Sequence, residues 1–237
     1  MTIMEEINRL TERIQDLSQI RKQTIGFSIE DKPLFSMKDE EIVGIDQQIE
    51  NAQKRLSYIR SQADINALPL RWRTVEFDKT IPGCDIAEKF ADNFPNNGRG
   101  IIFIGEVGRG KTHLAGAIAR RVIEKYQVPV LFRSYAALLD DIKRNFDEDR
   151  REIDRIVNSP LVVIDDLGQE KQSEWNKEVL FKIVNGRYEN MLPMIITTNS
   201  TVMTLRDNIG EPVFSRLYEM CDAVKVNGKD HRIGGKE

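Results

Sequence analysis

The stretch GEVGRGKTH, from Gly105 to His113, combines glycines, a lysine and a threonine at a spacing that suits phosphate chemistry. It fits the pattern GxxxxGK followed by Thr, and it lies between the apolar run IIFI and the helix-like run LAGAIARRVI. The glycines let the backbone turn tightly, so that successive amide N–H groups and the helix N-terminus face one anion. Glycine-rich turns without a ligand also occur, but the Lys-Thr pair at these positions favours a phosphate-binding loop.

Two side chains of this loop have the chemistry to hold a nucleoside triphosphate. Lys111 is expected to reach the β- and γ-phosphates, and the Thr112 hydroxyl is expected to bind Mg²⁺. The residues expected to contact the nucleotide are Gly105, Gly108, Arg109, Gly110, Lys111, Thr112 and His113.

Acidic and amide side chains follow two of the apolar runs further along the chain. LVVIDDLG places Asp165 and Asp166 at the carboxyl end of a buried strand, which is the edge where ligands bind in open α/β sheets. Asp165 suits the Mg²⁺ shell, and Asp166 can orient or deprotonate the attacking water. IITTN puts Asn199 at another strand end, where its amide can hold that water or touch the γ-phosphate. The acids could instead cap the next helix, but LGQEKQSEW is a poor helix start, which favours the catalytic interpretation.

Four apolar runs predict the strands that position these residues. They are GIIFIG, VPVLFRS, PLVVIDD and PMIITTN, separated by helical stretches. Such continuous runs are typical of strands that are covered on both faces of a parallel sheet, so the predicted fold class is α/β with helices on both sides. We expect this domain to occupy residues 68–237, after a linker that contains Pro69, and residues 1–67 to form a separate helical region.

Residues 1–67 contain two heptad seams. Apolar residues recur in steps of three and four from Ile3 to Leu17 and again, more regularly, from Ile42 to Ala63. Two such helices can close into an antiparallel hairpin or pair with the helices of a partner, and the pattern favours neither. Because a regular apolar seam needs an apolar surface to bury it, we expect residues 1–67 to be a small helical region that binds a partner.

The composition and charge balance of the chain exclude several classes of protein. The 35 Lys and Arg residues nearly cancel the 38 Asp and Glu residues, so no global basic field draws the chain to nucleic acid and any DNA contact must be local. No apolar run approaches a membrane span, and MTIMEEINRL lacks the basic and apolar regions of a signal peptide. Cys84 and Cys221 show no metal-ligand spacing with His113 or His231, so we expect reduced, buried thiols in a cytoplasmic protein with no membrane partner.

The order of these motifs resembles that of AAA+ ATPases and, more closely, the DnaC/IstB-like family of bacterial and phage helicase loaders. The resemblance runs from Arg71 to the C-terminus. The stretches that carry it are RWRTVEFD, GEVGRGKTHLAGAIA, VLFRSYAALLDDIKRNFD, LVVIDDLGQEKQSEWNKEVLFKIVNGRYE, PMIITTNS, FSRLYEMCDAV and GKDHR. It implies a three-layer AAA+ P-loop domain with a parallel sheet, preceded here by the coiled-coil hairpin, and ATP with Mg²⁺ as the cofactors.

The resemblance also implies roles for two arginines. Arg216 in FSRL looks like the arginine finger that reaches the nucleotide of a neighbouring subunit, which implies self-association through the ATPase domain. From spacing alone it would be a surface arginine on a helix. Arg232 in DHR looks like the family's C-terminal arginine near the nucleotide.

Members of this family carry an element that contacts single-stranded DNA after the second core strand, where this chain has SYAALLDDIKRNF. Lys143 and Arg144 can meet phosphates there, and Tyr135 or Phe146 can stack on bases. The alternative is an ordinary amphipathic helix, which is the better interpretation for Phe146.

The leading functional hypothesis is an ATP-dependent DNA replication protein that loads a replicative ring helicase onto single-stranded DNA, with ATP binding and hydrolysis switching assembly and release. An IstB-like transposition helper is the alternative within the same fold. A metabolic P-loop kinase would need an acceptor pocket and an arginine-bearing lid, whereas the second acid and Asn199 suit a hydrolase. A non-enzymatic adaptor that works through its heptad helices is the fourth hypothesis, and ATP hydrolysis stimulated by single-stranded DNA would exclude it.

Overall fold

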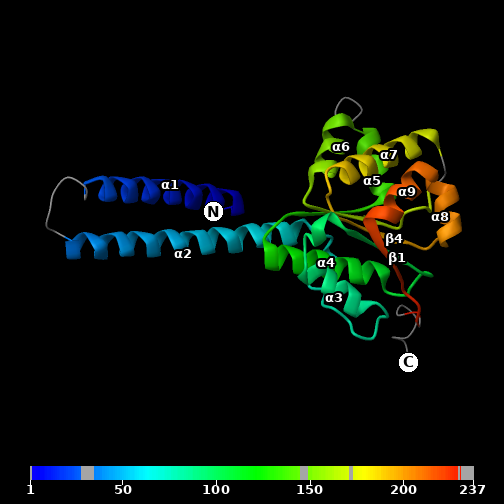
Figure 1. The fold of residues 1–237 in the computed structure, drawn as a ribbon, viewed down its shortest axis with the longest axis horizontal. Helices are drawn as coiled ribbons and strands as arrows, with labels where there is room; N and C mark the ends of the chain where they lie inside the picture. Colours follow the sequence, from blue (N-terminus) through cyan, green and yellow to red (C-terminus); the bar gives the residue numbers. More distant parts are fainter. Residues whose placement is uncertain (1, 28–34, 145–148, 171–172, 229, 231–237) are drawn as a thin grey trace. The chain divides into compact units, whose positions relative to one another are not determined.

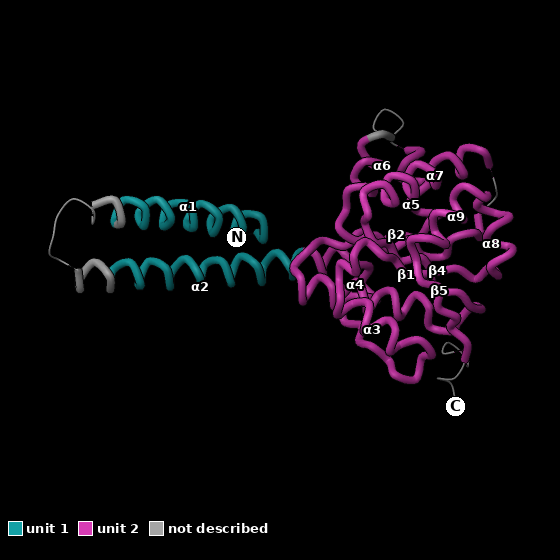
Figure 2. The backbone as a smooth tube through the Cα atoms, viewed as in Figure 1, with its two compact units in different colours: residues 1–63 teal, residues 64–237 magenta. Residues whose placement is uncertain are grey.

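A computed structural model divides the chain into two compact units, residues 1–63 and 64–237 (Figure 2). It describes residues 2–27, 35–144, 149–170, 173–228 and 230, and gives the backbone alone for 25–27, 35–40 and 149–150. The change of unit falls inside a helix that continues to Ala67, the residue at which we expected the first region to end. The partner-binding role of that region stays a prediction.

The first unit consists of two antiparallel helices, α1 (Ile3–Phe27) and the larger part of α2 (Phe35–Ala67) (Figure 1). Ion pairs join the two helices near both ends of α1, which fixes the antiparallel alignment although exposed pairs add little stability. The pairs are Arg21 with Asp46, and Arg55 with Glu6 at an N–O distance of 3.1 Å.

The two heptad seams are buried to different degrees. On α2, Ile45, Ala52 and Leu56 are at most 9% exposed, whereas the seam of α1 from Ile7 to Leu17 is half-buried. A pair of helices covers one stripe on each partner, so apolar side chains outside that stripe stay in solvent. The helices therefore pack together and still expose apolar surface. The most exposed large apolar side chains of this unit are Ile3, Met4, Ile20, Val43 and Tyr58.

The second unit contains a five-stranded parallel sheet (Figure 1). The strand order is β2-β3-β4-β1-β5. All residues of β3 and β4 are buried, as expected for central strands with both faces covered. The predicted α/β class with a parallel sheet is confirmed. The fifth strand was not predicted, because CDAVK has charged residues instead of a continuous apolar run. The strands are β1 (Gly100–Ile104), β2 (Val130–Ser134), β3 (Leu161–Asp165), β4 (Met194–Thr198) and β5 (Cys221–Lys225).

Helices pack on both faces of the sheet, which gives three layers (Figure 1). On one face lie α3 (Cys84–Asp92) and α4 (Lys111–Tyr126). On the other face lie α5 (Tyr135–Arg144), α6 (Asp149–Asn158), α7 (Glu174–Glu189), α8 (Val202–Ile209) and α9 (Glu211–Met220). Short 3₁₀ helices span Leu70–Trp72 and Asn96–Gly98. Within the described ranges, none of the helices combines the length and apolar character needed to cross a membrane.

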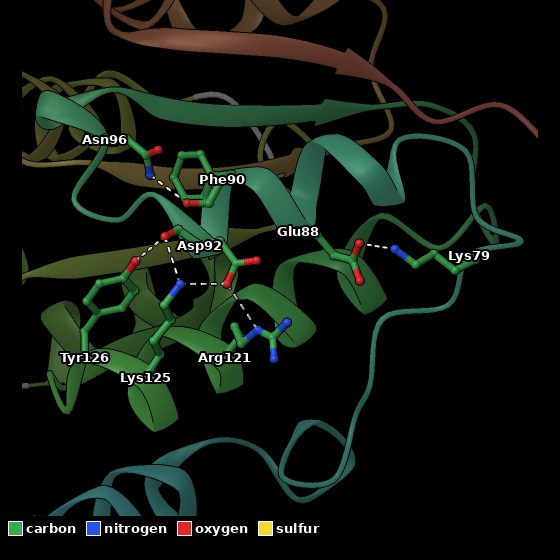
Figure 3. Close-up of polar contacts among 8 residues, drawn as sticks. All are labelled: Lys79, Glu88, Phe90, Asp92, Asn96, Arg121, Lys125 and Tyr126. Atoms are coloured by element: carbon green, nitrogen blue, oxygen red, sulfur yellow. Dashed lines mark hydrogen bonds and ion pairs between the residues drawn. The ribbon is translucent and has the colours of Figure 1, made fainter.

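Helix α4 begins at the glycine-rich loop, and polar contacts tie its far end to α3 (Figure 3). The Asp92 carboxylate accepts a hydrogen bond from Lys125 Nζ at 3.0 Å and lies 3.5 Å from Arg121 Nε. The backbone carbonyl of Asp92 accepts from the hydroxyl of Tyr126 and from Lys125 Nζ at 3.0 Å. Because apolar contacts carry most of the packing energy, these exposed contacts mainly fix the position of α4 along α3.

Both cysteines are unbonded and buried, as predicted for reduced thiols. Cys84 packs in the core beneath α3, and Cys221 packs in the core on the opposite face of the sheet. Burial raises the pKa of the Cys221 thiol to about 12, so this group stays neutral at physiological pH. A buried neutral thiol is a poor nucleophile, which is consistent with a packing role.

Candidate functional site

A cleft of about 370 Å³ opens at the carboxyl ends of β1, β3 and β4. Its floor is formed by the phosphate loop and the start of α4, and one side is formed by Asp165, Asp166 and Asn199. The cleft is large enough for a small-molecule ligand. The residues that we predicted from three separate sequence motifs thus meet in one place, at the sheet edge where ligands of open α/β sheets bind.

The backbone of the phosphate loop depends on its glycines. Gly108 and Gly110 have φ angles of 81° and 95°, in the left-handed region that side-chain-bearing residues rarely adopt. A Cβ atom on Gly105 would lie 2.3 Å from the carbonyl oxygen of Val226, so close approach of the chain also requires glycine there. Among the described residues, no side chain caps the first turn of α4, whose N-terminus opens at Gly110. The backbone amide groups of the first helical turn and the helix dipole favour an anion at this point.

Lys111 and Thr112 lie where α4 begins. Lys111 is only 4% exposed, and its Nζ donates a hydrogen bond to the carbonyl oxygen of Glu106 at 2.7 Å. The Thr112 hydroxyl lies near the Asp165 carboxylate and acts to lower the pKa of that group. The ammonium group is therefore held inside the loop, and the hydroxyl is held at the acidic side of the cleft.

The two acids differ in burial and backbone conformation. Asp165 is 9% exposed, and burial raises the pKa of its carboxyl group, although hydrogen bonds from Thr197 and Thr112 act against this rise. Asp166 has a φ of 56°, which Asp tolerates better than most residues. Its Oδ1 accepts a hydrogen bond from Asn199 Nδ2 at 3.2 Å. The carboxylates of Asp165 and Asp166 thus follow each other in sequence but have separate polar partners.

Thr197 is a residue of this site that the sequence argument did not single out. Its side chain is fully buried in β4, donates a hydrogen bond to Asp165 Oδ1 at 2.6 Å and accepts one from the Asp166 backbone N–H at 2.9 Å. The available signal was a polar residue inside a run that otherwise reads as a buried strand.

One wall of the cleft also went unpredicted. It is formed by Arg71, Trp72, Asp78 and Ile81, which precede the sheet in sequence. The Trp72 ring stacks on Phe132 with a centroid distance of 6.2 Å, and the Arg71 guanidinium lies 5.3 Å from the Trp72 ring. The stretch RWRTVEFD contributes to the family resemblance, but its spacing carries no chemical pattern by itself.

The other residues predicted to contact the nucleotide do not all line the cleft. His113 lines the cleft, with Nε2 2.8 Å from the Glu76 carbonyl oxygen. Gly105 and Arg109 instead line a neighbouring cavity of about 660 Å³, which Asn199 also borders. Arg109 contacts the Gly228 carbonyl oxygen and donates to Glu106 Oε2 at 2.5 Å. Arg232 lies outside the described residues.

Arg216 lies on α9 and does not line the cleft of its own chain. Its Nε donates to Asn185 Oδ1 at 2.8 Å, and its Nη1 donates to the Pro212 carbonyl oxygen at 2.8 Å. The guanidinium also lies 5.2 Å from the Phe181 ring and 5.7 Å from the Tyr188 ring. These contacts with α7 hold the side chain in one orientation. The finger role stays a prediction.

The candidate DNA contacts separate into exposed and buried residues. Lys143 and Arg144 are exposed in the last turn of α5, and Lys143 Nζ lies 4.8 Å from the Trp175 ring. Tyr135 is only 4% exposed and its hydroxyl donates to the Asn176 carbonyl oxygen at 2.7 Å. The expectation that Tyr135 stacks on bases is therefore wrong, because its ring belongs to the core. Phe146 lies outside the described residues.

The residues in the cleft fit a nucleotide with Mg²⁺. Mg²⁺ prefers oxygen ligands and is commonly held by one or two protein side chains together with phosphate oxygens. The Thr112 hydroxyl and the Asp165 carboxylate provide such oxygens side by side. In the described part of the chain, no group of three or more His, Cys, Asp or Glu side chains is arranged to hold a metal by itself. Lys111 and the N-terminus of α4 provide the complementary positive charge for phosphates.

Comparison with known proteins places the chain in a family. A family model described as IstB-like ATP binding protein matches residues 8–237. An ATP-binding protein of insertion sequence IS5376 from Geobacillus stearothermophilus is 26% identical over 214 residues, 86% of this chain and 81% of that relative. The protein YqaM of Bacillus subtilis is 32% identical over 151 residues, 58% of this chain and 47% of YqaM. The chain thus spans about half the length of the curated Bacillus subtilis relatives that it matches.

A solved structure extends this relationship to the fold. The crystal structure of the DnaC helicase loader superposes with a TM-score of 0.62 and 32% sequence identity, over 67% of this chain and 100% of that chain. The sheet and its flanking helices therefore form a P-loop AAA+ domain like that of the loader. The match to the family model covers nearly the whole sequence, and this chain belongs to the family of IstB-like ATP-binding proteins.

Proposed function

We propose that this protein hydrolyses ATP and uses the nucleotide state to load a replicative ring helicase onto single-stranded DNA. The observation that carries the proposal is the meeting of Lys111, Thr112, Asp165, Asp166 and Asn199 in one cleft. The likeness to a DnaC helicase loader, at 32% identity over the whole of that structure, supports the helicase as the partner.

In this proposal the phosphate loop binds the triphosphate. Lys111 turns from the Glu106 carbonyl oxygen toward the β- and γ-phosphates, while the loop amides and the first turn of α4 hold the remaining oxygens. Thr112 and Asp165 would hold Mg²⁺, which would supply positive charge to the phosphate oxygens. Trp72 and Ile81 form an apolar wall beside these polar groups.

Hydrolysis then depends on the acidic side of the cleft. Asp166 accepts a proton from the attacking water or orients it, and Asn199 holds the Asp166 carboxylate through its amide at 3.2 Å. As the water oxygen bonds to the γ-phosphorus, the bond from that phosphorus to the β–γ bridging oxygen breaks, and ADP and phosphate form. Arg216 of a neighbouring copy stabilises the charge that develops on the transferred group, so the proposal includes self-association through the ATPase domain.

The test measures ATP turnover and helicase loading with the same protein. We expect single-stranded DNA to stimulate hydrolysis, and we expect ATP to increase the amount of replicative helicase recovered on single-stranded circular DNA. Lys143→Ala combined with Arg144→Ala should weaken the DNA stimulation without changing the DNA-free rate, because both side chains are exposed on α5. Turnover that ignores DNA, together with no recruitment of helicase, would contradict the proposal.

A second candidate is a helper ATPase for transposition. It is favoured by the family match and by the ATP-binding protein of insertion sequence IS5376, whose similarity extends over 86% of this chain. This function would use the same cleft but a different partner. It predicts that the protein stimulates strand transfer by a transposase encoded beside it and does not recruit a replicative helicase. The loading assay and the strand-transfer assay therefore separate the two candidates.

A further inference from the structure

Thr197 is bonded to both acids of the cleft at once. The parallel register pairs Ile164 with Ile196, so the next positions bring Asp165 and Thr197 side by side on neighbouring strands. The Thr197 hydroxyl donates to Asp165 Oδ1 at 2.6 Å and accepts from the Asp166 N–H at 2.9 Å. The Thr197 backbone carbonyl oxygen also accepts from the Leu167 N–H at 2.9 Å. Thr197 of β4 thus bonds to three consecutive residues, Asp165 at the end of β3 and the two residues that follow it.

The polarity of this position needs an explanation. Thr197 is fully buried in the central part of the sheet, and the positions before it on β4, Ile195 and Ile196, are apolar. Valine has almost the same shape and would fill the same space, but it has no hydroxyl group. A buried hydroxyl costs free energy unless it is hydrogen-bonded, and here both of its bonds go to the acidic pair.

The two bonds have different consequences. The donated bond restrains the Asp165 carboxylate, whose pKa the nearby Thr112 hydroxyl also acts to lower. The accepted bond holds the backbone N–H of Asp166, whose φ of 56° is a left-handed conformation. Such a conformation costs free energy and persists only when surrounding contacts stabilise it. One hydroxyl therefore couples the direction of the first carboxylate to the backbone conformation that aims the second.

We infer that Thr197 is a positioning residue for ATP hydrolysis, which joins the metal-binding acid Asp165 to the water-orienting acid Asp166. The inference rests on the proposed function, because it assigns Thr197 a part in turnover. Thr197 is not among the residues that line the cleft, so it would act through the two acids. Its removal should therefore affect turnover much more than nucleotide binding.

The experiment compares Thr197→Val, which removes the hydroxyl at nearly constant shape, with Thr197→Ser, which keeps it. In Thr197→Val we expect kcat to fall at least about 10-fold while the equilibrium affinity for a non-hydrolysable ATP analogue stays within about 3-fold. Thr197→Ser should recover most of the lost kcat. Hydrogen exchange of the Asp166 amide, measured by NMR without nucleotide, should become at least about 10-fold faster in Thr197→Val and stay protected in Thr197→Ser.

Tyr135→Phe is the matched control. It also removes a buried hydroxyl, one whose bond of 2.7 Å goes to the Asn176 carbonyl oxygen outside the cleft lining. It should lower thermal stability by a similar amount and leave kcat and the Asp166 amide unchanged. If Thr197→Val unfolds, Thr197→Cys provides the comparison, because its thiol is a much weaker hydrogen-bonding group than a hydroxyl and leaves less of a cavity than alanine would.

The outcomes separate this inference from the proposed function. An unchanged Asp166 amide in Thr197→Val overturns the positioning role, whatever the rate of hydrolysis. Faster exchange with an unchanged kcat overturns the link to turnover. If the wild-type protein bound ATP but never hydrolysed it, the proposed function would fail, and the amide measurement alone would then show whether Thr197 holds Asp166.

Discussion

At the scale of single residues, the proposed function gives phosphate binding and water activation to different side chains of the cleft. Lys111 is buried in the phosphate loop and bonded to the Glu106 carbonyl oxygen, whereas Asp166 lies at the end of β3 and is bonded to Asn199. A cation in the loop attracts the phosphates in the ground state and in the transition state alike. A carboxylate that takes a proton contributes only as the reaction proceeds. Substitutions at the two positions should therefore have different kinetic signatures.

Lys111→Ala should abolish tight nucleotide binding. Removing the charge that faces the β- and γ-phosphates costs about 1.5–3 kcal/mol, on the order of 10- to 100-fold in affinity. Calorimetric titration with ATP provides the measurement. Lys125→Ala on the same helix is the control, because its amine bonds to Asp92 at the far end of α4. Equal ATP affinities of Lys111→Ala and the wild type would exclude the phosphate loop as the binding site.

Asp166→Asn should bind ATP normally and lose hydrolysis. The amide keeps the size of the side chain, and Asn tolerates the φ of 56° at this position as well as Asp does. An amide cannot accept a proton from water, so we expect kcat to fall by about 100-fold or more with little change in affinity. Single-turnover measurements with saturating protein test this directly. A rate close to that of the wild type would reduce Asp166 to a strand-end residue.

Sequence reasoning identified the cleft residues that belong to the phosphate loop or follow an apolar strand, Asn199 included, and missed those whose place depends on packing between distant segments. Lys111, Thr112 and the acidic pair belong to local patterns whose spacing itself carries the chemistry. Thr197 and Trp72 acquire their places only through strand register and through packing against Phe132, neither of which is encoded within a few residues. A hydroxyl inside an apolar run is a weak signal until its partner strand is known.

At the scale of secondary-structure elements, buried Arg187 connects α7 to the end of α6 and to the segment before β4. It is completely buried, and its guanidinium donates to the carbonyl oxygens of Ile156 and Ser159, each at 2.8 Å, and to that of Pro193. The Ile156 oxygen lies in the last turn of α6, where carbonyl groups have no partner within the helix. Burial lowers the pKa of Arg187 to about 10, still far above physiological pH, so the group stays charged.

Arg187→Met should therefore destabilise the protein strongly. Methionine fills much of the volume but leaves several carbonyl oxygens buried without a donor, at a cost of about 3 kcal/mol. Urea denaturation measures the change in the free energy of unfolding. Arg206→Met, which breaks an exposed pair with Glu211, should cost less than about 1 kcal/mol. Similar values for the two variants would argue against a tethering role of Arg187.

Arg216→Ala should leave ATP binding by the isolated subunit intact and reduce hydrolysis in the assembled state. Its contacts with Asn185 and the Phe181 ring hold the side chain on α9, outside the cleft of its own chain. A cation supplied by a neighbour is worth on the order of 100-fold or more in kcat. Mixing Arg216→Ala with Asp166→Asn should restore part of the activity, because one variant supplies the acid and the other the arginine. No restoration at any ratio would count against action between subunits.

The elements themselves were largely predictable, and the exceptions have physical causes. The strands β1 to β4 are continuous apolar runs because helices cover both faces of the sheet. β5 lies at the edge of the sheet with Asp222 and Lys225 exposed, and such a short charged strand has no distinct pattern. The contacts of Arg216 with α7 depend on which helices become neighbours on one face, which periodicity does not specify.

At the scale of the whole molecule, the two units have separate cores and separate tasks in the proposed function. All residues that line the cleft belong to the second unit. From the regular seam of α2 we expected an apolar partner that buries it. Within the chain, Ile45 and Leu56 of that seam are already buried, with exposed fractions of 7% and 9%. Polar substitutions at these two positions would disrupt the helical hairpin itself and could not report on an external partner. The exposed apolar side chains of the hairpin are the better probes.

We therefore expect the triple variant Met4→Ser, Val43→Ser and Tyr58→Ser to bind the replicative helicase much more weakly. These side chains are 63%, 66% and 55% exposed, so their removal costs little folding energy but takes away apolar contact area that a partner would bury. Co-purification with the helicase should fall at least about 10-fold, while circular dichroism and DNA-free ATP hydrolysis stay unchanged. The double variant Gln15→Ser and Gln48→Ser, which alters exposed polar side chains of the same helices, should bind normally. Full helicase binding by the triple variant would indicate that the helicase-binding surface lies on the ATPase domain instead.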